Sequence, residues 1–561
     1  MTVGSFADLG RQGVERFLQT VLVIDNELTL DAPAEFVPTI VVPPAASLRG
    51  ASAKPDPAPP ASPATSSTAR GRSAESPLDA KQIMDAFLRR SLICGMHKPN
   101  RGDELVAEAI RAARRSDAVI VDWMLDGKDP RGAKEIIAGI VEGDRGENGR
   151  LRLIVVYTSE QNVMSISTQI SERLSDLTLQ APGAGVLTKS DLRIVVMNKE
   201  GTVGGSNIVP VAALPARIVE EFAHLTKGVL ATFAVSAIAA VRRSTHHVLA
   251  VFSDEMDGAF LGHMCALKSP EDALDFALDL LGGELRGVAS MNPETAAVLS
   301  PLSLGLHIDA LATGGKLTHG QIEVPLEHAR LFPEGGLTAV KASAPDQRRS
   351  GTNDPPSKRD RINELNVGYL FHCGRSTAEE AHERFARLAS FRTEMFDRTD
   401  LPASWVPTLT LGTLVRRIGE GEPSGYLLCT QPRCDALRLD GPRRYPFQTA
   451  VEATGAAFNL VAAAPDAVGA IRNVKLVVKS KPCDALMLSF APTGTGRVQA
   501  ARVGGGPFEF VDADGNRYLW IGDLREMTAQ RAASSVAARL HEVGIDEFEW
   551  LRFKGVAKIE D

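Results

Sequence analysis

Four runs of apolar residues in the first 200 positions each end in a polar side chain. With their polar ends, the runs lie at 21–27, 117–122, 151–158 and 192–199, and most of their positions are Val, Ile or Leu. Continuous apolar runs of this length are typical of strands that are buried on both faces, as in a parallel sheet. The pattern therefore predicts four central strands.

Segments with helical periodicity separate these runs. A short strand is predicted at 92–96. Strands that alternate with helices of about 10–15 residues indicate βαβ units. We therefore expect an α/β domain with a five-stranded parallel sheet and five helices. The helices are predicted at 79–90, 104–115, 132–141, 163–174 and from 212 onward.

The polar residues that end the four runs form a chemically suggestive set. They are Asp25 with Asn26 and Glu27, then Asp122, Thr158 and Lys199. Open α/β sheets bind ligands at the carboxyl ends of their strands, so these side chains are expected to lie together. Two acids, a hydroxyl and a lysine in that order suit a site that accepts a phosphoryl group, because Mg²⁺ and lysine neutralise the oxygens of that group.

The rest of the chain divides by composition. Residues 31–77 hold 10 of the 33 prolines with much Ala and Ser, which indicates a disordered insertion within a first domain at 1–230. A helical connector is predicted at 231–340 and a polar linker at 341–358. Strand-like alternation and a hairpin turn at 512–516 then predict a β-rich α+β domain at 359–561.

The helix that leaves the first domain continues without a strong breaker to about residue 252. Its apolar face includes Val229, Leu230, Phe233, Ile238 and Val241. Such a face fits either the core of one chain or a second subunit. A homodimer through this helix is therefore one expectation.

Length and charge limit the possible functions. At 561 residues the chain is expected to form about three domains. The formal net charge is −7, and no helix-turn-helix with a basic recognition helix is evident, so we expect no nucleic-acid partner. The longest apolar stretch, 228–240, is shorter than the ~20 residues of a membrane span. Six cysteines without an export signal are typical of a reducing compartment, so a cytoplasmic protein is expected.

Three cysteines of the C-terminal half need a separate interpretation. Cys429 and Cys434 have four residues between them, and the sequence after Cys434 recurs after Cys483. These three could be zinc ligands, or one could be a reactive thiol. Zinc sites usually show two close pairs, however, so we favour two equivalent strand starts in which Cys packs as a small apolar residue.

Residues 19–230 resemble the receiver domain of two-component response regulators. VLVIDNE resembles the first strand of that family with its acid pair, and DAVIVDWML resembles the third strand with its phosphoacceptor. LIVVYTS and RIVVMNK resemble the fourth and fifth strands. The resemblance implies a flavodoxin-like fold with Asp122 as phosphoacceptor, Asp25 as a Mg²⁺ ligand, Thr158 as the signalling hydroxyl and Lys199 as the charge partner.

The sequence departs from the family pattern in three places. Asn26 stands where a second acid is usual, which weakens the expected Mg²⁺ site of Asp25, Asn26 and Asp122. The loop after the first strand is about fifty residues long. Lys189 is an alternative to Lys199, which we favour because its strand is longer. An inactive pseudo-receiver that serves as a scaffold is therefore a second hypothesis.

The resemblance also implies partners. A histidine kinase would supply the phosphoryl group, and an unknown output protein would bind the switched surface. Large receiver proteins without a DNA-binding output resemble components of bacterial conflict or phage-defence signalling.

Overall fold

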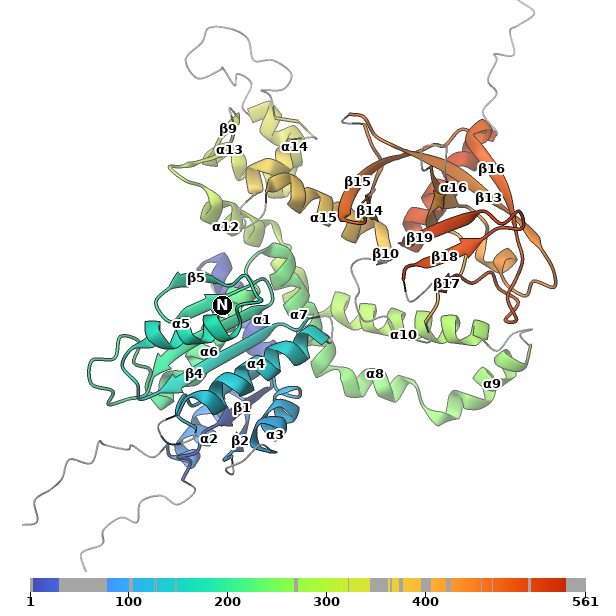
Figure 1. Ribbon diagram of the computed structural model, residues 1–561. Helices are drawn as coiled ribbons and strands as arrows, with labels where there is room; N and C mark the ends of the chain where they lie inside the picture. Colours follow the sequence, from blue (N-terminus) through green and yellow to red (C-terminus); the bar gives the residue numbers. More distant parts are fainter. Residues whose placement is uncertain are drawn as a thin grey trace, which may run out of the picture. The chain divides into compact units, whose positions relative to one another are not determined.

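The computed structural model describes most of the chain (Figure 1). The described residues are 4–29, 78–99, 104–125, 127, 129–146, 149–266, 271–320, 322–343, 362–363, 366–372, 377–394, 405–419, 425–455, 457–466, 468–502 and 506–540. The insertion predicted at 31–77 and most of the linker predicted at 341–358 lie outside these residues. The chain forms two compact units, one of residues 1–243 with 292–298 and one of residues 244–291 with 299–561.

A mixed sheet of seven strands forms the centre of the first unit. Its order is β2-β1-β3-β4-β7-β6-β5, and the first five strands are parallel. The predicted five-stranded parallel sheet is therefore confirmed. The antiparallel hairpin β5–β6 was not predicted, because β5 is fully exposed and lacks an apolar run. The strands are β1 (Thr20–Ile24), β2 (Ile93–His97), β3 (Ala118–Val121), β4 (Arg152–Thr158), β5 (Gln180–Gly183), β6 (Val186–Thr188) and β7 (Leu192–Asn198).

Helices cover both faces of this sheet (Figure 1). One core joins the sheet to α1, α2, α6 and α7, and the other joins it to α3, α4 and α5. Because both faces are covered, the central strands are continuously apolar, as the sequence indicated. The helices are α1 (Phe6–Phe17), α2 (Ala80–Leu88), α3 (Glu104–Ala113), α4 (Arg131–Gly146), α5 (Val163–Arg173), η1 (Val211–Ala213), α6 (Leu214–Leu225), α7 (Val229–Arg243) and α11 (Pro293–Val298).

Helix α7 buries a different face from the apolar one that its sequence suggested. Thr232, Val235 and Ser236 are buried, whereas Leu230 and Ile238 are 57% and 50% exposed. The reason is close packing against α1, where a Cβ atom on Gly13 would lie only 2.9 Å from the Ser236 hydroxyl. Small side chains therefore face α1, and Leu230 and Ile238 remain at the surface.

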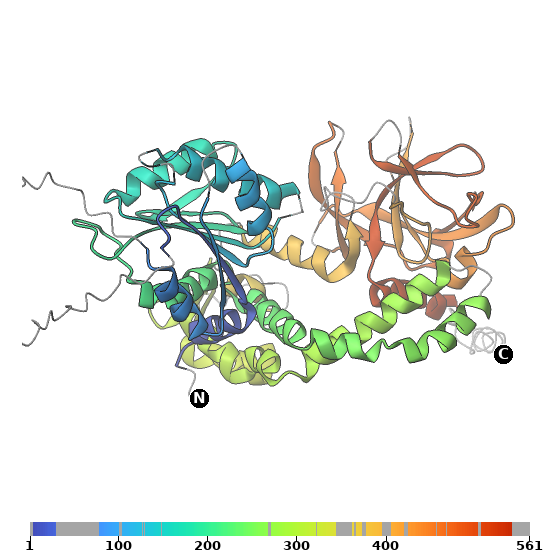
Figure 2. The same cartoon turned by 90° about the horizontal axis from the view of Figure 1, so that it is seen from below.

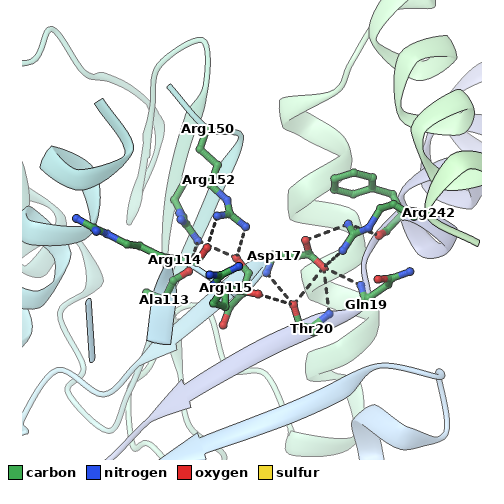
Figure 3. Close-up of polar contacts among 11 residues, drawn as sticks. Gln19, Thr20, Ala113, Arg114, Arg115, Asp117, Arg150, Arg152 and Arg242 are labelled. Carbon is green, nitrogen blue, oxygen red and sulfur yellow. Dashed lines mark hydrogen bonds and ion pairs between the residues drawn. The ribbon is translucent and has the colours of Figure 1, made fainter. Parts of the chain in front are cut away.

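Arginines hold the end of the sheet at which the parallel strands begin (Figure 3). Arg242 of α7 donates to both carboxylate oxygens of Asp117 at 3.0 and 3.2 Å. The same carboxylate accepts from the backbone N–H groups of Gln19 and Thr20. Buried Arg152 donates to the carbonyls of Ala113 and Ser116. These contacts fix the last turn of α7 to the starts of β1 and β3.

The second unit begins with a pair of antiparallel helical segments (Figure 2). A small module with its own core follows, and it contains a hairpin that the prediction of a helical connector at 231–340 did not include. The elements are α8 (Thr245–Val251), η2 (Asp254–Met256), α9 (Asp257–Ala266), α10 (Glu271–Met291), α12 (Pro301–Leu311), β8 (Lys316–His319), β9 (Ile322–Pro325), α13 (Leu326–Ala329), α14 (Phe332–Ser343) and η3 (Val367–Phe371).

The C-terminal region is β-rich and also contains two α-helices in its described residues, which confirms the predicted β-rich α+β class. One antiparallel sheet has apolar cores on its two faces. The hairpin turn predicted at 512–516 joins two antiparallel strands, β18 and β19. The elements are α15 (Ala378–Ser390), β10 (Phe391–Glu394), β11 (Thr413–Ile418), β12 (Tyr426–Cys429), η4 (Arg433–Ala436), β13 (Arg443–Glu452), β14 (Leu460–Pro465), β15 (Ile471–Val478), η5 (Pro482–Asp484), β16 (Ala485–Phe490), β17 (Ala501–Arg502), β18 (Phe508–Val511), β19 (Arg517–Leu524) and α16 (Glu526–Leu540).

None of the helices in the described ranges is long and apolar enough to cross a membrane.

Candidate functional site

Asp25, Asp122 and Lys199 meet at the carboxyl ends of three parallel strands. The ammonium nitrogen of Lys199 lies 2.8 Å from Asp25 Oδ2 and 2.8 Å from Asp122 Oδ1. All three side chains are buried. The structure thus brings together residues that are up to 174 positions apart in the sequence.

Backbone hydrogen bonds carry the strand register one residue past the strand ends. Asp122 N–H donates to the Ile24 carbonyl at 2.9 Å, and Lys199 N–H donates to the Thr158 carbonyl at 2.8 Å. Asp25 N–H donates to the carbonyl of the last residue of β2 at 3.2 Å. The register of the apolar strands therefore determines the positions of the charged residues that follow them.

The second oxygen of each carboxylate accepts a hydrogen bond from a backbone N–H two residues later in the chain. Asp25 Oδ1 accepts from the N–H of Glu27 at 2.7 Å, and Asp122 Oδ2 accepts from the N–H of Met124 at 2.8 Å. Such bonds orient both carboxylates before any ligand arrives.

The charges of the site do not balance. Two buried carboxylates share one ammonium group. Burial raises the pKa of Asp122, the ammonium of Lys199 opposes this effect, and the Asp25 charge adds to it. Burial alone would lower the pKa of Lys199, but Asp122 and Asp25 more than offset it and raise that pKa. Lys199 is therefore held as a cation in a site with surplus negative charge.

Asn26 completes an oxygen-rich corner beside the carboxylates. Its amide N–H donates to the Met124 carbonyl at 3.3 Å, whereas its Oδ1 atom is buried and has no hydrogen-bond partner among the described residues. An unpartnered amide oxygen next to surplus carboxylate charge fits a hard divalent cation such as Mg²⁺. The described residues hold no group of three or more His, Cys, Asp or Glu side chains that could bind a metal, so this set is poorer in carboxylates than a typical site.

Thr158, at the end of β4, is buried near this site. Its hydroxyl accepts from the N–H of Glu160 at 3.1 Å, and the Glu160 carbonyl accepts from the side chain of Asn198 at 2.6 Å. The Asn198 Oδ1 atom in turn accepts from Asn207 N–H at 3.1 Å. Asn198 therefore links the loop after β4 to the loop after β7.

The sequence analysis did not identify Asn198. The available signal was an amide at the end of an apolar strand directly before Lys199. A nearby glycine is required as well, because a Cβ atom on Gly205 would lie 2.9 Å from Asn198 Oδ1.

The alternative lysine lies elsewhere. Lys189 follows β6 and lines a small hollow with Arg150 and Asp191, before β7 begins. Lys199 is thus the lysine that contacts both acids.

The three cysteines of the zinc hypothesis lie in different surroundings. Cys429 is buried, and burial raises the pKa of its thiol to about 12. Cys434 and Cys483 are exposed. A thiol with so high a pKa is a poor nucleophile at neutral pH. Among the described residues, no group of three or more His, Cys, Asp and Glu side chains that could hold a metal includes these cysteines.

A comparison with known protein families agrees with this geometry. Residues 17–204 match the family model described as the response receiver domain. No curated protein and no solved structure gave a significant match. The match spans the strands that carry Asp25, Asp122, Thr158 and Lys199. Residues 17–204 of this chain therefore form a response receiver domain.

Proposed function

We propose that Asp122 accepts a phosphoryl group from a partner histidine kinase and that this changes how the protein binds an output protein. The observation that carries the proposal is the buried contact of Lys199 with both Asp122 and Asp25 at 2.8 Å. A lysine placed in this way can pair with the charge that arrives on the phosphoryl oxygens.

The proposed step is an in-line transfer. An oxygen of ionised Asp122 forms a bond to phosphorus, the bond from phosphorus to the kinase imidazole breaks, and its electron pair stays on that nitrogen. Lys199 exchanges its contact with Asp122 Oδ1 for a contact with a phosphoryl oxygen. Asp25, Asp122 and Asn26 would hold Mg²⁺, which supplies charge neutralisation at the phosphoryl oxygens.

The proposed output starts at Thr158. Its hydroxyl accepts the Glu160 N–H at 3.1 Å, and a turn of the hydroxyl toward the phosphoryl group would break this bond. The Glu160 carbonyl is held by Asn198, which also holds Asn207. A change at Thr158 would therefore alter both loops next to the site.

The competing proposal is a pseudo-receiver scaffold that binds partners without phosphorylation. Asn26 favours it, because an amide attracts Mg²⁺ less than a carboxylate does. A homodimer through α7 is supported by the exposed Leu230 and Ile238. The bacterial conflict or phage-defence setting rests on the resemblance alone.

Intact mass spectrometry tests phosphorylation. The protein is incubated with Mg²⁺ and a small phosphodonor, beside Asp122→Asn. A gain of one phosphoryl group in the parent alone is expected. No gain, together with no Mg²⁺-dependent change in the fluorescence of buried Trp123, would leave the scaffold as the better proposal.

Asn26→Asp sharpens this test. It adds the carboxylate that the site lacks, so Mg²⁺ should bind more tightly and phosphorylation should be faster. Equal Mg²⁺ affinity in the two proteins would show that Asn26 does not contribute to metal binding.

A further inference from the structure

Residues 244–291 form a helical arm with almost no core of its own. Segments α8 and α9 lie alongside α10 (Figures 1 and 2), and the rings of His263 and Phe276 lie 4.9 Å apart. Val248 and Ala273 are its buried residues within the described ranges. Eleven of the 33 large apolar side chains that are exposed in the described chain lie in this arm. An amphipathic helix gains most of its stability by packing an apolar face, so the arm is incomplete by itself.

The exposed apolar residues of α10 follow a heptad pattern. Leu274, Leu278 and Leu281 are 62%, 55% and 37% exposed, and partly buried Leu285 and Val288 continue the row. The spacings alternate between four and three residues, as at the core positions of a coiled coil. This stripe fits an apolar stripe on another helix.

The charge of the arm distinguishes between possible partners. It contains eight Asp and Glu against two Lys and Arg, a formal net charge of −6 in a chain whose total is −7. Asp275 and Asp279 of α10 are both exposed. A second copy of the arm would bring −6 against −6, whereas a basic helix would bring opposite charge beside the stripe.

We propose that α10 is a docking site for a partner helix that has an apolar stripe flanked by Lys or Arg. The apolar stripe would supply burial, and the flanking cations would pair with the arm's carboxylates and select the partner. This surface does not depend on phosphoryl transfer at Asp122, so the two proposals can fail separately.

Binding of designed helical peptides to the full chain tests the proposal. One peptide of four heptads carries Leu at the core positions and Lys at the flanking positions, and a matched peptide carries Glu at the flanks. Calorimetry should show binding of the Lys peptide, weakening as salt increases, and no binding of the Glu peptide. Leu278→Gln with Leu281→Gln should weaken binding at least about tenfold. Leu302→Gln, at a 71% exposed residue of α12, should not.

A charge exchange gives an independent test that keeps the apolar stripe. Asp275→Lys with Asp279→Lys should favour the Glu peptide over the Lys peptide. Equal binding of both peptides to the parent, or unchanged binding after the double Leu→Gln exchange, would overturn the proposal. The proposal would also be overturned if the parent sedimented as a dimer and the double Leu→Gln exchange converted it to a monomer. The helix that covers α10 would then belong to a second copy of the chain.

Discussion

Buried carboxylates lie at both ends of the parallel sheet in the first unit, and their surroundings differ in charge. Where the strands begin, Asp144 pairs with Arg152 and Asp117 pairs with Arg242. Where the strands end, Asp25 and Asp122 share Lys199, and the Asn26 Oδ1 atom has no partner among the described residues. Each buried carboxylate has its own arginine at one end, whereas two carboxylates share a single ammonium group at the other.

The two ends of the sheet therefore differ in how their buried charges affect stability. A buried charge that lacks a full partner lowers stability and is kept where it serves a purpose. The receiver site lies at the end with the surplus charge. The arginine-rich end instead fixes α7, the helix that leads out of the receiver domain (Figure 3).

The largest expected effect comes from Arg152→Met at the balanced end. Arg152 donates to both oxygens of Asp144 at 2.6 and 2.7 Å, and its side chain is 1% exposed. Removing it leaves a buried carboxylate unpaired, so unfolding of the first unit should become easier by about 3–5 kcal/mol. Hydrogen exchange of β4 amides measures this. Arg145→Met, which breaks an exposed pair with Asp176, should cost less than about 1 kcal/mol.

A smaller loss is expected from Arg242→Met. Asp117 would keep its bonds from Gln19 and Thr20 but would lose its cation, at a cost of about 2 kcal/mol. Amides of α7 should exchange faster, since this contact holds its last turn. The matched control is Arg243→Met, which breaks an exposed pair with Glu294. Equal effects of the two exchanges would contradict a special role for Asp117.

Asp122→Asn should stabilise the first unit, whereas the two arginine exchanges destabilise it. It removes one of the two carboxylates that share Lys199, so the free energy of unfolding should rise by about 1 kcal/mol while phosphorylation is lost. Asp144→Asn should lower it, because Arg152 then lacks its counter-charge. If both exchanges destabilise the unit, the inference that the two ends of the sheet differ in their charge balance would be contradicted.

The smallest expected effect is a pH dependence of the stability that Asp122→Asn adds to the first unit. The pKa of Asp122 is raised in the folded protein, so the folded state holds this proton more tightly than the unfolded state. Its charging therefore destabilises the fold as the pH rises from the unfolded pKa through the raised folded pKa. The advantage of Asp122→Asn should be larger at pH 7 than at pH 4, measured by the same hydrogen exchange. A constant advantage would show that Asp122 has no raised pKa.

The sequence predicted the parallel sheet well because the sheet depends on buried apolar strands. The run that ends at Val121 is fully buried, and its register places Asp122 beside Asp25. The hairpin β5–β6 escaped prediction because exposed strands such as Gln180–Gly183 carry no apolar signal. Asn198 escaped it because its role depends on two loops that meet only in the folded chain.

The buried face of α7 shows the limit of periodicity. Leu230 and Ile238 marked the apolar face, yet packing against α1 selected Thr232 and Ser236. The approach of two backbones, permitted by Gly13, outweighed the size of the apolar side chains.

The amino-acid sequence by itself determined the parallel sheet, the order of acids, hydroxyl and lysine along it, and the β-rich character of the C-terminal region. Continuous apolar runs are sufficient for this, since only burial on both faces accommodates them. The tertiary structure alone decided that Lys199 rather than Lys189 meets both acids and that α10 leaves a leucine stripe exposed. It also decided that the buried carboxylates at one end of the sheet each pair with an arginine, whereas the two at the other end share one lysine. These properties depend on distances between residues far apart in the chain, which local patterns do not encode.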